Sequence, residues 1–186
     1  MRPIAIIIGC WIIFEVYWLA SAHGLKLTVE RQSWRSLVAQ RLPVLLGVLL
    51  ISLPVVPYPL SQAFLREPWA AAAGVVLCVL GLCIAVWARH RLAGNWSALV
   101  TLKKDHELIE SGPYRFVRHP IYTGILAMLL GTAVVMGRLG GWMGFLCVTL
   151  GFWMKLKHEE ALMLRHFPDK YPAYQTRVKA LVPFVI

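Results

Sequence analysis

"PIYTGILAMLLGTAVVMGRLGGWMGFLCVTLGFWMK" occupies residues 120–155. It holds two apolar runs, 120–137 and 139–155, joined by only a few residues around Gly137–Gly141. Each run has about the 17–20 residues that a helix needs to cross a hydrocarbon core of about 30 Å. Because the link is so short, the pattern predicts a tight helical hairpin. The residues before and after it should therefore lie on the same side of a membrane.

The rest of the chain is also too apolar for a soluble protein. Of its 186 residues, 59% are hydrophobic and 15% charged, whereas soluble domains average about 25% charged. Three further apolar segments, at about 3–22, 42–60 and 69–88, bring the total to five. Pro43, Pro54, Pro57 and Pro59 in the second predict that its far end is kinked or unwound. The expected fold is an all-α integral membrane protein with five transmembrane helices.

The net charge of +10 is consistent with either nucleic acid or anionic lipid as a partner. If the N-terminus is outside, only Arg2, Arg66 and Arg138 of the 19 Lys and Arg residues fall outside. This bias predicts five spans with the N-terminus out and the C-terminus in, membrane lipids as neighbours and no nucleic-acid partner. A cleaved signal peptide at 1–22 is the alternative, but it would place the basic stretch 26–41 outside.

Two long polar stretches, the loop 89–119 and the C-terminal segment 156–186, fall on the same predicted side of the membrane. They lie at the two ends of the hairpin. Topology therefore predicts that they lie close together in space. The chain divides accordingly into residues 1–88, three spans with a basic loop at 23–41, and residues 89–186, a functional region made of the loop 89–119, the hairpin 120–155 and the segment 156–186.

The stretch "SGPYRFVRHPIYTGI", residues 111–125, concentrates cationic and aromatic residues at the start of a predicted membrane helix. Pro120 suits the first helical turn, which places His119 at or next to the N-cap. The helix dipole attracts anions there, Arg118 adds a charge, and Tyr122 follows one turn later. These features predict a site for a carboxylate or a phosphate. The alternative is that the arginines reach lipid headgroups and the tyrosine belongs to an interfacial aromatic belt.

Glu159 and Glu160 lie beyond the second arm of the hairpin. Adjacent helical residues point about 100° apart, so at most one glutamate is expected to face the same site squarely. That carboxylate suits an ammonium group or a pair of ribose hydroxyls. Alternatively, the pair is solvated and neutralises Lys155 and Lys157.

Glu15 is the only acidic residue inside a predicted span. A charge at the membrane centre costs roughly 2.5–3.5 kcal/mol on insertion scales, so Glu15 should face the bundle or a polar cavity. It either approaches the same site or pairs with a residue such as Arg89.

No motif with metal-ligand spacing occurs, so we expect no metal. The four cysteines fall within apolar segments without CxxC spacing, which is typical of packing residues.

Two stretches carry a resemblance to a known family: "HELIESGPYRFVRHPIYTG", residues 106–124, and "EEALMLRHFPDKYPAYQTRVKALVPFV", residues 159–185. Together with the intervening hairpin they resemble the isoprenylcysteine carboxyl methyltransferases, a family similar to the phospholipid methyltransferases. The resemblance covers about residues 89–186. It implies an integral-membrane methyltransferase without a Rossmann domain that uses S-adenosylmethionine. Such enzymes hold the cofactor at the cytoplasmic edge, capped by the C-terminal end, and take a lipophilic or prenylated substrate from the bilayer.

The resemblance also implies site residues. Arg118 and Glu159 are the expected catalytic residues, and Lys155 matches the basic position that touches substrate. Eukaryotic members have arginine there, and lysine lacks its planar bidentate fork. The cofactor contacts implied are His106, Glu107, Leu108, Ile109, Tyr114, His119, Pro120, Ile121, Tyr122, Glu159 and Glu160.

The expected reaction is carboxyl O-methylation of an isoprenylcysteine-type substrate, with N-methylation of an amino-phospholipid as the alternative. A carboxylate nucleophile needs no general base, whereas an amine needs a proton acceptor such as Glu159, Glu160 or His158. Two other classes stay open: a membrane reductase that uses NADPH, and a non-enzymatic membrane protein. The expected location is a prokaryotic plasma membrane, with the site on the cytoplasmic face.

Overall fold

The computed structural model describes residues 3–22, 28–31, 34–53, 57–63, 67–93, 101–103 and 108–185. Within them the helices are α1 (Pro3–Ala20), α2 (Trp34–Ser52), α3 (Pro68–Leu92), α4 (Pro120–Met136), α5 (Leu139–His166) and α6 (Tyr171–Arg177). The other elements are a 3₁₀ turn, η2 (Gly112–Arg115), and two short strands, β1 (Thr28–Arg31) and β2 (Thr101–Lys103). The prediction of a helical membrane protein is confirmed.

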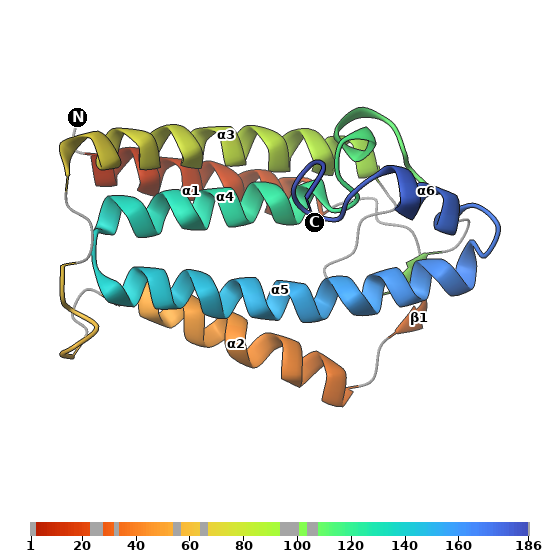
Figure 1. The fold of residues 1–186 in the computed structure, drawn as a ribbon, viewed down its shortest axis with the longest axis horizontal. Coiled ribbons are helices and arrows are strands. Elements are labelled where there is room, and N and C mark those ends of the chain that lie inside the picture. The colour runs from red at the N-terminus through yellow and green to blue at the C-terminus, as the bar shows by residue number, and fades with distance from the viewer. Residues whose placement is uncertain are drawn as a thin grey trace.

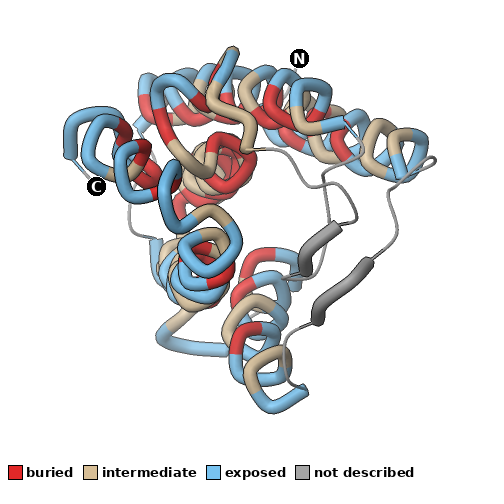
Figure 2. The backbone as a smooth tube through the Cα atoms, turned by 90° about the vertical axis from the view of Figure 1, so that its right-hand side faces the viewer, coloured by how far each residue is buried: buried red, intermediate tan, exposed pale blue. Residues whose placement is uncertain are grey.

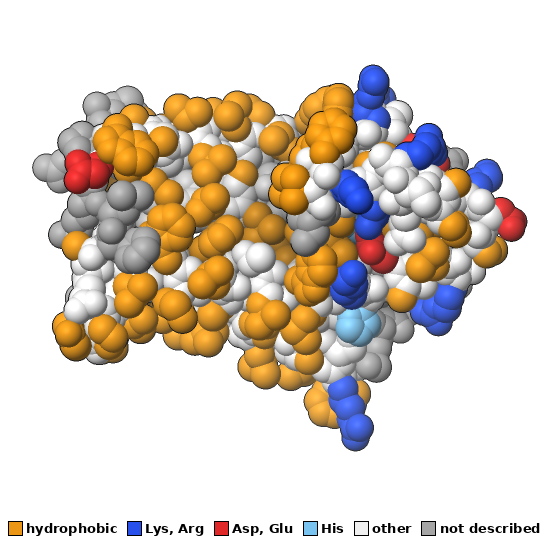
Figure 3. All heavy atoms as spheres, in the orientation of Figure 1, with side chains coloured by type: hydrophobic (Ala, Val, Ile, Leu, Met, Phe, Trp, Pro, Cys, Tyr) orange, Lys and Arg blue, Asp and Glu red, His pale blue; other side chains and the backbone are white. Residues whose placement is uncertain are grey.

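The helices form two groups joined by the α4–α5 hairpin (Figure 1). α3 packs along α4 with α1 beside it, and α2 packs along α5. The sides that face one another are buried and the outer sides are exposed (Figure 2). Apolar side chains cover the middle of the visible face, and charged ones gather toward one end (Figure 3). This distribution is that of a bundle whose outer surface faces lipid.

Glycines bring the paired helices into close contact. A Cβ atom on Gly124 of α4 would lie 2.6 Å from the carbonyl oxygen of Gly81 in α3. Between α2 and α5, a Cβ on Gly144 would lie 2.6 Å from the Gly47 oxygen. In lipid, helices associate mainly through close packing, so small residues at these positions hold the bundle together.

The predicted tight hairpin is confirmed. α4 ends at Gly137, which adopts a left-handed conformation (φ 59°, ψ 30°) and donates its N–H to the Ala133 carbonyl. This is a common way to end a helix, and glycine adopts the conformation without strain. α5 begins two residues later, at Leu139. The Arg138 side chain donates to the Ile51 carbonyl at 3.1 Å and ties the turn to the end of α2.

Four helices, α1, α2, α3 and α5, are long and apolar enough to cross a membrane. The fifth predicted span is α4, whose 17 residues lie at the lower end of the spanning range. The predicted bounds of the second span, 42–60, are wrong, because α2 runs from Trp34 to Ser52. It contains Pro43 and ends two residues before Pro54, since a proline disfavours helical geometry in the residue before it.

The expectation that Glu15 faces the bundle is wrong. Its side chain is exposed on the outer side of α1. Arg89, its suggested partner, is buried and donates to the carbonyls of Ser21 and Ala93. Glu15 lies five residues before the end of α1, about 8 Å along the axis, which predicts a carboxylate nearer to a membrane surface than to the centre.

β1 and β2 pair in an antiparallel sheet that the sequence did not predict. The sheet joins the segment after α1 to the one after α3, at the same end of the bundle as α6 (Figure 1). The described parts of the basic segments therefore meet at one end. Which side of the membrane this end faces stays a prediction, as does the division of the chain at residue 88.

Candidate active site at the basic end of the bundle

The start of α4 is joined to the C-terminal end of the chain by backbone hydrogen bonds. As expected, Pro120 occupies the first turn of α4 and His119 is the N-cap. The backbone N–H groups of Arg118 and His119 donate to the carbonyls of Lys179 and Ala180 at 2.8 and 2.9 Å. One turn later, the Thr123 hydroxyl donates to the Leu181 carbonyl at 2.7 Å. We call residues 171–185 the tail.

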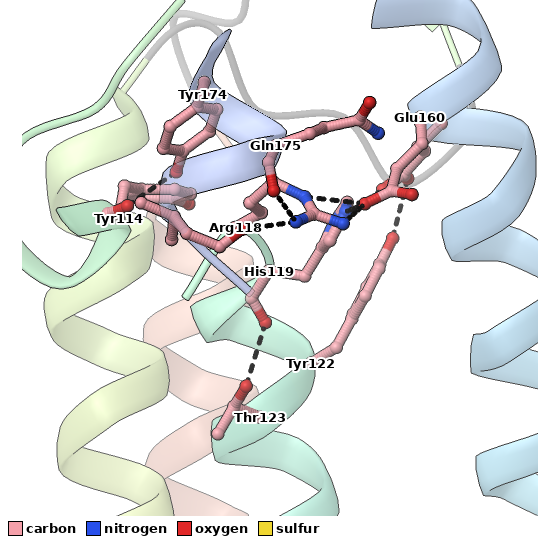
Figure 4. A network of polar contacts seen from close by, with 10 residues as sticks. Tyr114, Arg118, His119, Tyr122, Thr123, Glu160, Tyr174 and Gln175 are labelled. Carbon is pink, nitrogen blue, oxygen red and sulfur yellow. Dashed lines mark hydrogen bonds and ion pairs between the residues drawn. The ribbon is translucent and has the colours of Figure 1, made fainter. Parts of the chain in front are cut away.

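The Arg118 side chain connects α5 to this tail (Figure 4). Its Nε and Nη2 donate to Oε1 of Glu160 at 2.8 and 2.5 Å. Its Nη1 donates to the carbonyls of Val178 and, at 3.4 Å, Gln175. The side chains of Arg118 and Glu160 are only 10% and 9% exposed. Arg118 therefore directs its charge at Glu160 and at backbone carbonyls of the tail.

His119 lies between the two glutamates. Its Nδ1 is 3.6 Å from a Glu159 oxygen and its Nε2 is 3.4 Å from Glu160 Oε1. The imidazole stacks on the Tyr122 ring, with centroids 5.5 Å apart. Nε2 is buried and has no hydrogen bond of good geometry within the described chain. Its contact with Glu160 is therefore longer and weaker than an ordinary hydrogen bond.

Glu159 belongs to a second cluster, on the side of the site nearer the apolar bundle. The Tyr122 hydroxyl donates to Glu159 Oε1 at 2.6 Å, and the Lys155 ammonium lies 3.7 Å from the same oxygen. The ammonium also lies 5.2 Å from the centre of the Tyr122 ring. Phe152, one turn before Lys155, packs on that ring at 5.0 Å. Glu159 is 22% exposed, more than twice as much as Glu160.

Both glutamates reach the site, against the expectation that at most one would. The two glutamate side chains point in different directions around α5, but their partners at the start of α4 are also separated in space. Glu160 meets Arg118 before the helix, while Glu159 meets Tyr122 inside its first turn. Long side chains span the remaining angle. The alternative that the pair only neutralises lysines holds in part, because Lys155 contacts Glu159.

Tyr114, from η2, contacts α3 and the tail. Its hydroxyl donates to the Ala88 carbonyl at 3.4 Å, and its own carbonyl accepts from the Tyr174 hydroxyl at 2.5 Å. Burial raises the pKa of both tyrosines, so both stay protonated as donors.

The other predicted cofactor contacts are placed only in part. Ile109 and Ile121 pack in the apolar cluster beneath the site, with Tyr114 and Tyr122. Leu108 packs instead against the tail. His106 and Glu107 lie outside the described residues.

The resemblance implied that the C-terminal end caps the site, but sequence reasoning missed that the tail does so through backbone carbonyls. Val178, Lys179, Ala180 and Leu181 contribute backbone carbonyls, which leave no signature in the amino-acid sequence. The only signal in the sequence is the pair of tyrosines in this polar segment, since aromatic residues there suggest a segment that packs against the rest of the protein. Tyr171 and Tyr174 are both buried.

A family profile described as Phospholipid methyltransferase (PEMT) matches residues 69–170, more than half of the chain. The chain belongs to the phospholipid methyltransferase family. The matched range contains nearly all of α3, all of α4 and α5, and every side chain that forms the two clusters. The tail lies just beyond it.

This phospholipid methyltransferase family member is similar to several curated protein-S-isoprenylcysteine O-methyltransferases. The one from Tribolium castaneum is 31% identical over 126 residues, which cover 63% of this chain and 43% of the relative. The one from Rattus norvegicus is 30% identical, over 63% of this chain and 42% of the relative. The one from Schizosaccharomyces pombe is 30% identical, over 66% of this chain and 52% of the relative. The matched part thus spans about half the length of these relatives or less.

Proposed function

We propose that the chain is an integral-membrane methyltransferase that transfers a methyl group from S-adenosylmethionine to a lipophilic substrate. One observation carries this proposal: the Arg118–Tyr122 and Lys155–Glu160 stretches form one polar site at the end of an apolar bundle. Family membership supports methyl transfer over the reductase and non-enzymatic alternatives.

The residues present fit the proposed cofactor. Its methionine part carries an ammonium and a carboxylate, and its ribose carries hydroxyls. The partly exposed Glu159 suits the ammonium or the ribose, and the His119 imidazole, whose Nε2 has only a 3.4 Å contact with Glu160, is a candidate donor for the carboxylate. When bound, this cofactor supplies an electrophilic methyl group on a sulfonium.

The chain contributes mainly positioning and the exclusion of water. Methyl transfer requires nucleophile, methyl carbon and sulfur in line, and such alignment supplies much of an enzyme's rate. Tyr122 and Lys155 fix Glu159 from two directions. The aromatic ring of Phe152 closes the side nearer the membrane.

For the substrate we propose an isoprenylcysteine carboxylate. The names of the relatives support this choice, and Lys155 offers a partly exposed cation beside the site. A carboxylate is already a nucleophile, so this reaction asks nothing of Glu159 as a base. The isoprenoid chain would lie along the apolar side chains next to Tyr122, which include Ile125, Leu126 and Phe152.

An amino-phospholipid is the second candidate, and the description of the matching family favours it. An amine must lose a proton when it is methylated. Glu159 is a suitable acceptor, since its carboxylate is partly exposed and held in place by the Tyr122 hydroxyl. In either case we propose that the site faces the cytoplasm of a prokaryotic cell, where the cofactor is made.

The test is a radiolabelled methyl-transfer assay on the full chain in lipid nanodiscs, with both substrate classes supplied. We expect label in the isoprenylcysteine carboxyl group as a base-labile ester. Label in the phospholipid amine would replace the first substrate by the second. Glu159→Gln should abolish turnover. If the parent protein neither transfers label nor binds S-adenosylhomocysteine in calorimetry, the proposed function is wrong.

A further inference from the structure

We propose that the adjacent glutamates have different tasks: Glu160, with Arg118, is a positioning residue that docks the tail, and Glu159 faces the ligands. The docking stands on contacts in the structure alone, whereas the assignment of Glu159 rests on the proposed function. This division explains why two neighbouring carboxylates, one buried and one partly exposed, occur at one site.

The first support is how completely Arg118 is engaged. All three guanidinium nitrogens donate, two to Glu160 and the third to backbone carbonyls of the tail. With only 10% of its side chain exposed, Arg118 links three elements: the start of α4, α5 and the tail. Neutralisation by Glu160 allows the guanidinium to stay buried while it holds the carbonyls.

The second support is that the same stretch holds the tail through its backbone. Residues 117–119 and 179–180 run side by side, with a parallel bridge between Val117 and Lys179 and two hydrogen bonds from the N–H groups of Arg118 and His119. Side-chain and backbone contacts thus converge on four tail residues, Val178 to Leu181. Loss of the Arg118 contact should release that stretch first.

The third support is what surrounds Glu159. Its partners are Tyr122 and Lys155, and Nδ1 of its neighbour His119 lies 3.6 Å from its carboxylate. None of the hydrogen bonds or ion pairs of Glu159 among the described residues reaches the tail. Removing its charge should therefore change ligand binding and turnover while the tail stays docked.

Limited proteolysis of the full chain in nanodiscs tests the docking. Arg177 and Lys179 are exposed, but trypsin requires the surrounding backbone to open before it cuts there. Mass spectrometry would follow loss of the peptide after either residue. We expect Arg118→Lys and Glu160→Gln to speed this cleavage about tenfold, the effect of losing one or two buried hydrogen bonds. Glu159→Gln should stay within about twofold of the parent.

Arg118→Lys guards against simple unfolding, because lysine still neutralises Glu160 but cannot also reach the tail carbonyls. Arg115→Lys is the matched control, since Arg115 lies in the same loop, is exposed and stacks on Phe116. Parental cleavage in Arg118→Lys, or rapid cleavage in Glu159→Gln, would overturn the proposal.

S-adenosylhomocysteine binding by the same variants separates this inference from the proposed function. If both are correct, Glu160→Gln binds more weakly because its tail is open, and Glu159→Gln binds more weakly with its tail closed. If the parent fails to bind while the proteolysis pattern holds, the proposed function and the assignment of Glu159 fall and the docking role stands.

Discussion

At the scale of single residues, Lys155 distinguishes the two proposed substrates. Its ammonium is held between Glu159 and the Tyr122 ring, at the side of the site nearer the apolar bundle. Only an anionic substrate gains from a cation there. A dependence of the rate on the charge of Lys155 would therefore indicate a carboxylate rather than an amine as the methyl acceptor.

We predict that Lys155→Met lowers kcat/KM for an isoprenylcysteine substrate about 10- to 100-fold, the effect of losing one charged hydrogen bond. Lys155→Arg should retain most of the rate. Lys157→Met is the matched control, because Lys157 is exposed and lies over the Trp153 ring instead. Equal rates for Lys155→Met and the parent would exclude a charge contact with a carboxylate.

Tyr122 orients Glu159 through a hydrogen bond of 2.6 Å. We predict that Tyr122→Phe lowers kcat at least tenfold, because the carboxylate loses a donor that fixes its position. The ring and its stacking on His119 remain, so binding of S-adenosylhomocysteine should change less than turnover. Tyr58→Phe, at an exposed tyrosine outside the site, should have no effect. Methyl-transfer kinetics and calorimetry make the comparison, and a parental kcat in Tyr122→Phe would contradict it.

At the scale of helices, the close contact of α3 with α4 supports the site from below. Gly124 lies in α4 directly after Tyr122 and Thr123, and an added methyl group there would meet the backbone of Gly81 and Ala85 at 2.6 and 2.7 Å. Neither backbone atom can turn away, so the helices must separate. Such overpacking typically costs about 1–3 kcal/mol.

We predict that Gly124→Ala lowers the melting temperature in detergent by several degrees, since about 1 kcal/mol corresponds to about 2–4 °C in a protein of this size. The control is Gly9→Ala in α1, where an added methyl group meets nothing within 4 Å. Equal melting temperatures for the two variants would show that α3 and α4 can separate without loss of stability.

The hairpin was predictable, because two apolar runs joined by a short glycine link must lie antiparallel. The proximity of residues 111–125 to Glu159 and Glu160 followed from it, since these stretches lie at the two ends of the hairpin. The bounds of α2 were not, because its first turns, Trp34 to Arg41, are only partly apolar and escape a search for hydrophobic runs. The pairing of Arg118 with Glu160 was also missed. A basic motif predicts an anion but does not say whether the protein itself supplies it.

At the scale of the whole molecule, the charge bias predicts that the end carrying the site faces the cytoplasm. In Escherichia coli, a fluorescent protein fused after residue 186 should therefore fluoresce, and alkaline phosphatase at the same place should be inactive. The same reporters inserted at Gln62, beside the hairpin turn at the other end, should give the opposite result. Active phosphatase at the C-terminus would reverse the orientation and move the site outside.

The hairpin also limits how the chain can change its length. From the turn, α5 rises by 20 residue steps from Leu139 to Glu159, about 30 Å, while α4 leads back to Tyr122. One residue inserted into α5 before Lys155 would rotate everything after it by about 100° and advance it by 1.5 Å. Glu159 would then turn away from Tyr122, and Glu160 from Arg118. The number of residues between the turn and each motif therefore sets which side chains of α4 and α5 meet, whatever the identity of the residues in between.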